Sequence, residues 1–310
     1  MPVRIGAGLP TFGQGAGNAV PDIPALARAA EQSGLDAVWA GDHLSTGNPF
    51  LESTVALAAA AAVTERLSIG FGVLLLALRQ EAWAAKQLGS LQCLSRNRLL
   101  LGVGTGAGSP GEWAAAGIPR AERGRRTDAM LAALPRLLAG DATELGTVPG
   151  APVTALHPAV AMPPLWIGGG SDRAFRRVLD HGAGWLSSLL APEEFAHRLT
   201  ALSAMAARRG LPAPDAGTTV FAAVSRNGHR EKRDRMARFL GSLTGRSPAQ
   251  LERLVVSGPP EALAERLDEY RRSGARTFVV HLPGPDWARD YELLAEARAL
   301  LVPAVTGSGR

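Results

Sequence analysis

Eight short apolar segments alternate with helical patterns along this chain, and this alternation restricts its fold more than any other feature. The predicted strands cover residues 4–9, 37–40, 67–76, 99–103, 165–167, 185–188, 218–225 and 277–282. Continuous apolar runs of this length are typical of strands that are covered on both faces. Their regular alternation with helices, at spacings suited to right-handed crossovers, predicts an α/β fold with a parallel sheet.

Eight such units in 310 residues favour a (β/α)8 barrel. An open, doubly wound sheet is the alternative. No stretch has the composition of a domain linker, so we expect a single barrel domain over residues 1–305 and a flexible tail at 306–310. Residues 140–163 are rich in Pro, Gly and Thr and are too long for a plain connection, which predicts an insertion between strands 4 and 5, or a lid near a ligand.

Composition and charge argue against several classes of partner. The formal net charge is +5, but the basic residues are scattered, and their densest runs, 120–126 and 226–235, are interleaved with acids, so we expect no nucleic-acid partner. Cys93 is the only cysteine, which excludes an intrachain disulfide and fits a reducing compartment. The longest apolar run, 55–63, is too short to span a bilayer, and no signal peptide is evident. We expect a cytoplasmic protein that does not bind membranes.

Three glycines stand between a predicted strand and a predicted helix. Gly168, Gly169 and Gly170 follow the buried strand, and Ser171 lies where the helix would begin. Glycines let the backbone approach a ligand closely, and the first amides of a helix favour an anion, most often a phosphate. Asp172 weighs slightly against an anion, and a tight turn without a ligand is the alternative.

In a barrel, the residues that follow each strand gather on one face and hold the active site. This rule brings together Thr11, Asp42, His43, Leu75, Thr105, Gly168 to Gly170, Ser187, Ser188, Ser225 and His281. Asp42 is the only acid directly at a strand end, so the chemistry of paired carboxylates is unsupported. The histidines lack metal-binding spacings, and no Gly-x-Ser-x-Gly elbow occurs.

His43 is the candidate for proton transfer near neutral pH, with Asp42 beside it. Adjacent residues of a regular strand point to opposite faces, so only one of the two would face the pocket and the other would cap the next loop. A structural role is the alternative for His43 and equally for His281. Together with the glycines and the apolar residues 73–76, these parts suit a bound flat cofactor that performs redox chemistry.

Three arginines are further candidates for holding a phosphate or carboxylate, namely Arg79, Arg123 and Arg126. Ion pairs with Glu81 or Glu122 would explain them equally well.

Several of these motifs together resemble one known family. Residues 35–44, ending in Gly41-Asp42-His43-Leu44, resemble the second-strand signature of the bacterial-luciferase-like superfamily. Residues 66–75 are similar to its third strand, 98–106 to its fourth, and 163–170 with Gly184-Trp185 to its phosphate strand and the strand after it. The likeness covers most of the chain up to about residue 205 and continues weakly beyond it.

The resemblance implies a (β/α)8 barrel, usually a homodimer, that uses either reduced FMN with oxygen or the deazaflavin coenzyme F-420. Several deazaflavin enzymes carry an Asp-His pair at the second strand's end, as Asp42-His43 does here, whereas the luciferases proper tend to have Glu-His. It also implies that His43 lies near the reactive ring, and that a non-prolyl cis peptide at Gly72-Val73 forms a bulge against the ring's back face. The implied cofactor-binding residues are Gly72, Val73, Leu75, Thr105, Gly168, Gly169, Gly170 and Ser171.

One departure limits what the resemblance carries over. Deazaflavin sugar-phosphate dehydrogenases have a Glu shortly after the Gly-Thr-Gly of strand four, where this chain has Ala107. Their substrate and their general acid are therefore not assigned here.

We expect hydride transfer between a deazaflavin and a small organic substrate, with a reduced-FMN monooxygenase as the alternative. A flavin-binding barrel without turnover is the third hypothesis.

Overall fold

A closed parallel barrel forms the centre of the molecule. The computed structural model describes residues 2–12, 21–46, 49–106, 110–148, 150, 152–153 and 155–301. The barrel strands are β1 (Arg4–Gly8), β2 (Ala37–Ala40), β3 (Ser68–Leu74), β4 (Leu99–Val103), β7 (Leu165–Gly168), β8 (Gly184–Ser188), β9 (Ala216–Val224) and β11 (Thr277–His281). Strand β11 pairs with β1 and with β9, and β9 pairs with β8, so the sheet closes on itself. The predicted (β/α)8 barrel is confirmed, and the open sheet is excluded.

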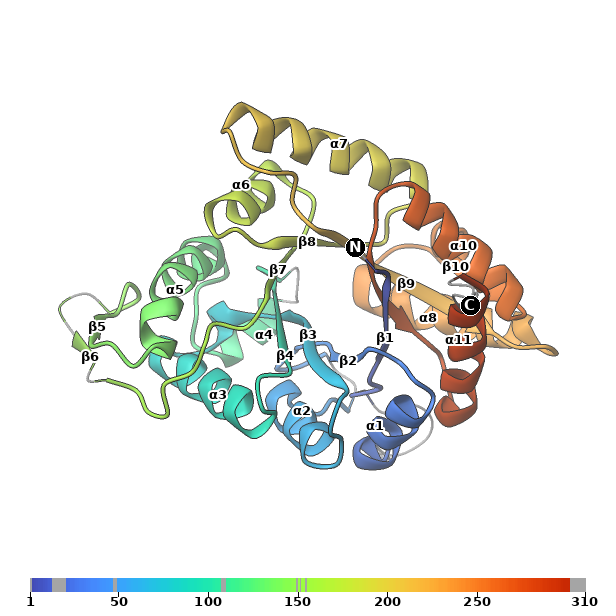
Figure 1. Ribbon diagram of the computed structural model, residues 1–310, viewed down its shortest axis with the longest axis horizontal. Helices are drawn as coiled ribbons and strands as arrows, with labels where there is room; N and C mark the ends of the chain where they lie inside the picture. Colours follow the sequence, from blue (N-terminus) through green and yellow to red (C-terminus); the bar gives the residue numbers. More distant parts are fainter. Residues whose placement is uncertain are drawn as a thin grey trace, which may run out of the picture.

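Helices surround the strands on all sides (Figure 1). They follow the barrel strands as the sequence pattern predicts, and their first turns are capped where Asp22 accepts from the amide of Ala25 and Ser171 accepts from that of Ala174. These helices are α1 (Ile23–Gln32), α2 (Ser53–Ala62), α3 (Glu81–Leu94), α5 (Arg123–Leu138), α6 (Asp172–Asp180), α7 (Pro192–Arg208), α10 (Pro260–Arg272) and α11 (Trp287–Leu301).

Several short elements were not predicted. Helix α4 (Pro110–Ala115) follows β4, and the 3-10 turns η1 (Leu76–Leu78) and η2 (Arg120–Glu122) precede α3 and α5. Between β9 and β11 the chain forms α8 (His229–Thr244), which was expected, and then α9 (Pro248–Glu252) and β10 (Val255–Gly258). Strand β10 pairs with the last four residues of β9, of which Phe221 also pairs with β11 and none pairs with β8.

The insertion between strands 4 and 5 exists, but the expectation of a lid was wrong. It carries the antiparallel pair β5 (Thr143–Glu144) and β6 (Pro152–Val153), which lies beyond α5 at the left edge of Figure 1. The insertion joins α5 to β7, so it belongs to the amino ends of the strands, whereas barrel ligands bind at the carboxyl ends. The buried carboxylate of Glu81 holds it there by accepting from the amide of Thr147 at 2.9 Å and from its hydroxyl at 2.7 Å.

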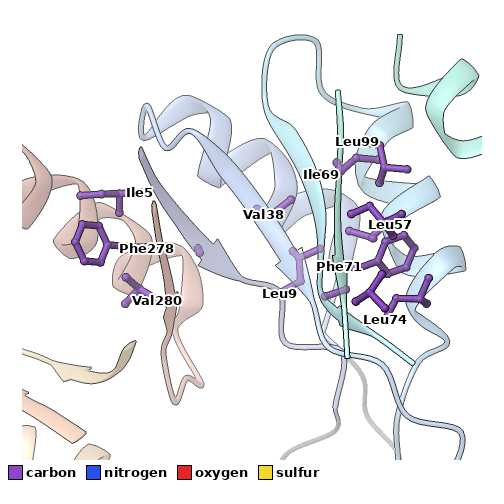
Figure 2. Close-up of a cluster of buried hydrophobic side chains, with 14 of the residues drawn as sticks. Ile5, Leu9, Val38, Leu57, Ile69, Phe71, Leu74, Leu99, Phe278 and Val280 are labelled. Atoms are coloured by element: carbon purple, nitrogen blue, oxygen red, sulfur yellow. The ribbon is translucent and has the colours of Figure 1, made fainter. Parts of the chain in front are cut away.

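The main hydrophobic core fills the layer between strands and helices. Ile69, Phe71 and Leu99 point outward from neighbouring strands toward Leu57 of α2 (Figure 2). The alternate residues point into the barrel and form a second cluster, which includes Ala37, Trp39, Leu100, Trp166, Leu186 and Val279. The interior is therefore filled, as in other packed barrels.

The C-terminal tail and a membrane span are two further features on which the sequence carried an expectation. The predicted tail at 306–310 lies outside the described residues. Within the described ranges, no helix combines the length and the apolar character that a membrane span would need.

Truncating the core side of α2 should destabilise the fold. Leu57 is 0% exposed, so we expect Leu57→Ala to lower the free energy of unfolding by about 3 kcal/mol through lost burial and a residual cavity. Val55→Ala on the same helix is the matched control, because Val55 is 67% exposed and its truncation should change stability by less than about 0.5 kcal/mol. Urea unfolding followed by circular dichroism measures both. Equal losses in the two variants would contradict the assigned core.

Candidate functional site

A cavity of about 500 Å³ opens at the carboxyl ends of the barrel strands. Several residues that the sequence assigned to this mouth line it, namely Thr11, His43, Thr105, Gly168, Gly169, Ser187, Ser188 and His281, and so do Gly72 and Val73, which the family resemblance implied as cofactor-binding residues. Other predicted residues do not line it, namely Asp42, Leu75, Gly170, Ser171 and Ser225. A second cavity, of about 520 Å³, lies at the amino ends of the strands, where barrel enzymes do not place their chemistry.

The side chain of Asp42 is bound away from the cavity. Its carboxylate accepts from both terminal nitrogens of Arg79, at 2.6 and 2.9 Å, from the hydroxyl of Ser53 at 2.7 Å and from the amide of Leu75 at 2.9 Å. Asp42 is 4% exposed. Of the two adjacent residues, His43 therefore faces the cavity and Asp42 anchors the turn.

His43 is paired with a carboxylate that the sequence reasoning missed. Its Nδ1 lies 3.1 Å from Oε1 of Glu112, in the first turn of α4, and the same oxygen accepts from the amide of Leu44 at 2.8 Å. An ionised carboxylate only accepts, so Nδ1 carries the proton and Nε2 is the ring nitrogen left for a ligand. The ring of Phe50 packs edge-on against His43, with 5.5 Å between the ring centroids.

The sequence did contain a signal for Glu112. The family pattern has a Glu shortly after strand four, where this chain has Ala107, and residues 107–109 lie outside the described part of the chain. However, Ser109-Pro110-Gly111-Glu112 has the spacing of a capping box with proline at the first helical position. That pattern directly after strand four predicts a helix start there, and it would have brought Glu112 to the carboxyl end of the barrel.

Strand β3 supplies the floor of the cavity. The Gly72–Val73 peptide is cis, as the family resemblance implied, and the pairing register with β4 shifts between Phe71 and Leu74. Val73 thereby reaches the cavity between two glycines. A Cβ at Gly104 would lie 2.5 Å from Val73, and one at Gly168 would lie 3.1 Å from it. The floor is therefore apolar and free of side chains on both sides of Val73.

The glycine turn after β7 leads from the cavity to the start of α6. Gly169 lines the cavity with φ of +99°, a conformation that favours glycine, and its carbonyl accepts from the indole nitrogen of Trp185 at 2.6 Å. Ser171 uses its side chain to cap α6, whose first amides lack acceptors within the helix. Gly169 lines the cavity, whereas Gly170, Ser171 and the first turn of α6, which carries Asp172, lie outside its lining.

The three candidate arginines bind other parts of the protein. Arg79 pairs with Asp42 and with Glu52, whereas the expected partners were Glu81 and Glu122. Arg123 donates to the carbonyl of Arg120, and Arg126 donates to the carbonyls of Ala77 and Arg79. None of the three lines the cavity.

His281 stands at the end of β11, two strands from His43. Its ring stacks on that of Phe221 with 5.3 Å between centroids and lies over Gly8, where an added Cβ would be 2.3 Å from Nδ1. Burial lowers the pKa of His281 to about 4. The imidazole is therefore uncharged near neutral pH.

No grouping of three or more residues able to hold a metal ion occurs in the part of the chain that the structure describes. The chemistry available at this mouth consists of a carboxylate-paired histidine, a neutral histidine, an apolar floor and a glycine turn that leads to the N-terminus of α6.

The chain matches the family model described as luciferase-like monooxygenase over residues 3–277. An uncharacterised Mycobacterium tuberculosis protein is 37% identical over 170 residues, which is 54% of this chain and 58% of that protein, so the match spans less than two thirds of its length. The F420-dependent glucose-6-phosphate dehydrogenase of Beutenbergia cavernae is 29% identical over 308 residues, with 89% of this chain and 91% of the relative covered.

Solved structures share the fold. An F420-dependent secondary alcohol dehydrogenase, determined with an F420-acetone adduct, superposes with a TM-score of 0.81 at 15% identity over 97% of this chain and 100% of that one. The oxygenating component of 3,6-diketocamphane monooxygenase from Pseudomonas putida, in complex with FMN, gives a TM-score of 0.75 at 18% identity over 97% and 99%.

Acid should destabilise the protein through His281. The pKa of His281 is about 4 in the folded protein against an ordinary 6.5, so the unfolded chain binds the proton first as the pH falls. The stability that the neutral ring contributes is complete above pH 6.5 and is lost between there and about pH 4. Across this window, we expect the wild type to lose about 3 kcal/mol more than His281→Phe. Urea unfolding at a series of pH values measures the difference, and parallel curves would contradict it.

Proposed function

The chain belongs to the luciferase-like monooxygenase family, and on that premise we propose that it is an oxidoreductase that moves a hydride between an F-420-type deazaflavin and a small organic substrate. The observation that carries the proposal is the His43–Glu112 pair, which stands at the same cavity as the Val73 floor and the glycine turn. Such a site can position a flat redox cofactor and supply one proton-transfer group.

The cavity fits the proposed cofactor in two respects. Val73, flanked by Gly104 and Gly168, offers a flat apolar surface on which a tricyclic ring can lie without meeting a neighbouring side chain. Gly169 and the start of α6 offer backbone amides and a helix dipole for the phosphate of its tail. When bound there, a deazaflavin supplies the carbon that accepts or returns the hydride.

The protein's part is proton transfer and positioning. Nε2 of His43 accepts the proton of a substrate hydroxyl in the oxidising direction, or returns it to a carbonyl oxygen in the reducing direction. Glu112 accepts from Nδ1 and so keeps Nε2 available as the proton acceptor, and it stabilises the imidazolium that forms. Asp42 and Arg79 hold the backbone from which His43 projects.

The Asp42-His43 pair favours a deazaflavin over FMN, and the Beutenbergia relative, which is named as F420-dependent, supports that choice. A reduced-FMN monooxygenase is the second candidate, because the apolar cavity that Leu9, Phe12 and Leu186 help to line would also protect an oxygen-reactive flavin from water. Non-catalytic flavin binding is less favoured, because it gives the His43–Glu112 pair no task.

A homodimer and a cytoplasmic location stay predictions.

Cofactor choice is measurable as a shift of the melting temperature. At about 100 times its Kd, a bound deazaflavin should stabilise the protein by about 2.7 kcal/mol and raise Tm by about 5 °C. Gly169→Ala should reduce this shift, because Gly169 shapes the phosphate turn at positive φ. Gly182→Ala is the control, since Gly182 also has positive φ but lies in open space outside the cavity lining. A shift with reduced FMN and none with the deazaflavin would overturn the first choice.

Loss of the proton-transfer group should slow turnover without affecting cofactor uptake. We expect His43→Ala to lower kcat by about 10²- to 10⁴-fold, and Glu112→Gln to lower it less, because the amide still accepts from Nδ1. The assay follows deazaflavin absorbance with propan-2-ol or cyclohexanol, and the control is His197→Ala, an exposed position on α7. If His43→Ala keeps full turnover, the role assigned to His43 is wrong whichever cofactor binds.

A further inference from the structure

The walls of the cavity carry almost no charge. Among the described residues that line it there is no Lys, Arg, Asp or Glu, and the two histidines are the only titratable side chains. Much of the wall is aromatic or aliphatic, with Phe12 stacked on Phe239 of α8 at 4.1 Å between centroids and Leu240 beside them.

Such a wall is a poor environment for an ionic substrate. A phosphate or carboxylate buried against it would lose its water without gaining a cation in return, which costs several kcal/mol. Arg238 and Arg246, which stand within two residues of lining residues in sequence, do not themselves line the cavity. Arg79 and Arg126 are bound to Asp42 and to backbone carbonyls.

His281 is one polar group of this wall whose side chain has no hydrogen-bond partner among the described residues, as is also true of the hydroxyls of Thr11 and Thr219. Neither of its ring nitrogens makes a hydrogen bond with a described residue. The edge that carries Nδ1 packs over Gly8, and Nε2 is not among the three ring atoms nearest to that glycine. The stack on Phe221 fixes the plane of the ring, so the free nitrogen has a defined direction.

The two histidines line the same cavity from strands that are two apart in the barrel. His43 follows β2 and His281 ends β11, and both strands pair with β1. Leu9 and Thr11, which follow β1, line the cavity between them. Both histidines therefore border one cavity, and only β1 separates the strands that carry them.

We propose that His281 positions the substrate by a hydrogen bond from its uncharged ring, and that the enzyme accepts neutral alcohols or ketones on an apolar frame and rejects phosphorylated ones. This inference rests on the proposed function and deepens it. It separates the chain from its Beutenbergia relative, whose name states a phosphorylated sugar as the substrate. The neutral state of the ring is consistent with its lowered pKa, because a buried imidazolium would attract the anions that the wall excludes.

The test compares substrates and variants on the deazaflavin-loaded enzyme. Cyclohexanol should be oxidised with a kcat/KM at least about 100-fold above that of glucose 6-phosphate, since an unpaired buried phosphate is costly. His281→Phe keeps the stack on Phe221 but removes the hydrogen bond, so KM for cyclohexanol should rise about three- to tenfold with kcat nearly unchanged. His281→Gln, which can still donate and accept, should recover part of this loss.

Two further readouts separate the possible failures. Calorimetric titration of the loaded enzyme with cyclohexanone should show weaker binding by the same factor in His281→Phe, and His197→Phe on α7 should match the wild type. An unchanged KM in His281→Phe, or a preference for glucose 6-phosphate, would overturn this inference while normal deazaflavin loading left the proposed function standing. A protein that takes up no deazaflavin in the melting assay would overturn both.

Discussion

The buried carboxylate of Asp42 is the constraint on which the geometry of the candidate site depends. A buried charge is tolerated only when it is paired and hydrogen-bonded, and Asp42 satisfies this with the bidentate guanidinium of Arg79, one hydroxyl and one amide. These bonds join the end of β2 to the residue after β3 and to the first turn of α2. Removing one partner of such a pair costs about 3 to 5 kcal/mol, because the other charge stays buried alone.

The same bonds determine where the neighbouring residues point. With Asp42 turned toward Arg79, His43 projects to the other side, into the cavity. Leu75, whose amide Asp42 holds, follows the bulge that brings Val73 to the floor. The hydrogen bonds of Asp42 therefore determine both the direction of the His43 side chain and the shape of the floor. The two histidines differ in their own partners, because His43 contacts a carboxylate and His281 stacks on an aromatic ring.

Most of the fold was predictable from the sequence, because covered parallel strands read as apolar runs. The predicted bounds of β2, β4 and α3 agree with the structure. Helix α9 has only five residues and is too short to produce a periodic signal, and β10 has only two apolar residues, Val255 and Val256, before Ser257 and Gly258. The site was predictable only in part. Alternation along β2 required that one of Asp42 and His43 turn away, but the choice depended on Arg79, a partner 37 residues along the chain. Glu112 was not predicted, because it does not stand directly at a strand end but enters the site from the first turn of helix α4.

The flat floor of the cavity follows from the way the barrel interior is filled. Trp39 occupies the interior below it, and Gly70 is required beside the indole, since a Cβ there would lie 2.5 Å from the ring. Val73 packs on this cluster, which fills the barrel interior on one side of it. Its side chain therefore lies at the boundary between the cluster and the cavity. Gly104 and Gly168 then leave the methyl groups of Val73 uncovered. The two neighbouring glycines at the end of β7 thus divide two roles: Gly168, its last residue, keeps the floor open for a ring, and Gly169 begins the turn proposed for the phosphate of the same cofactor.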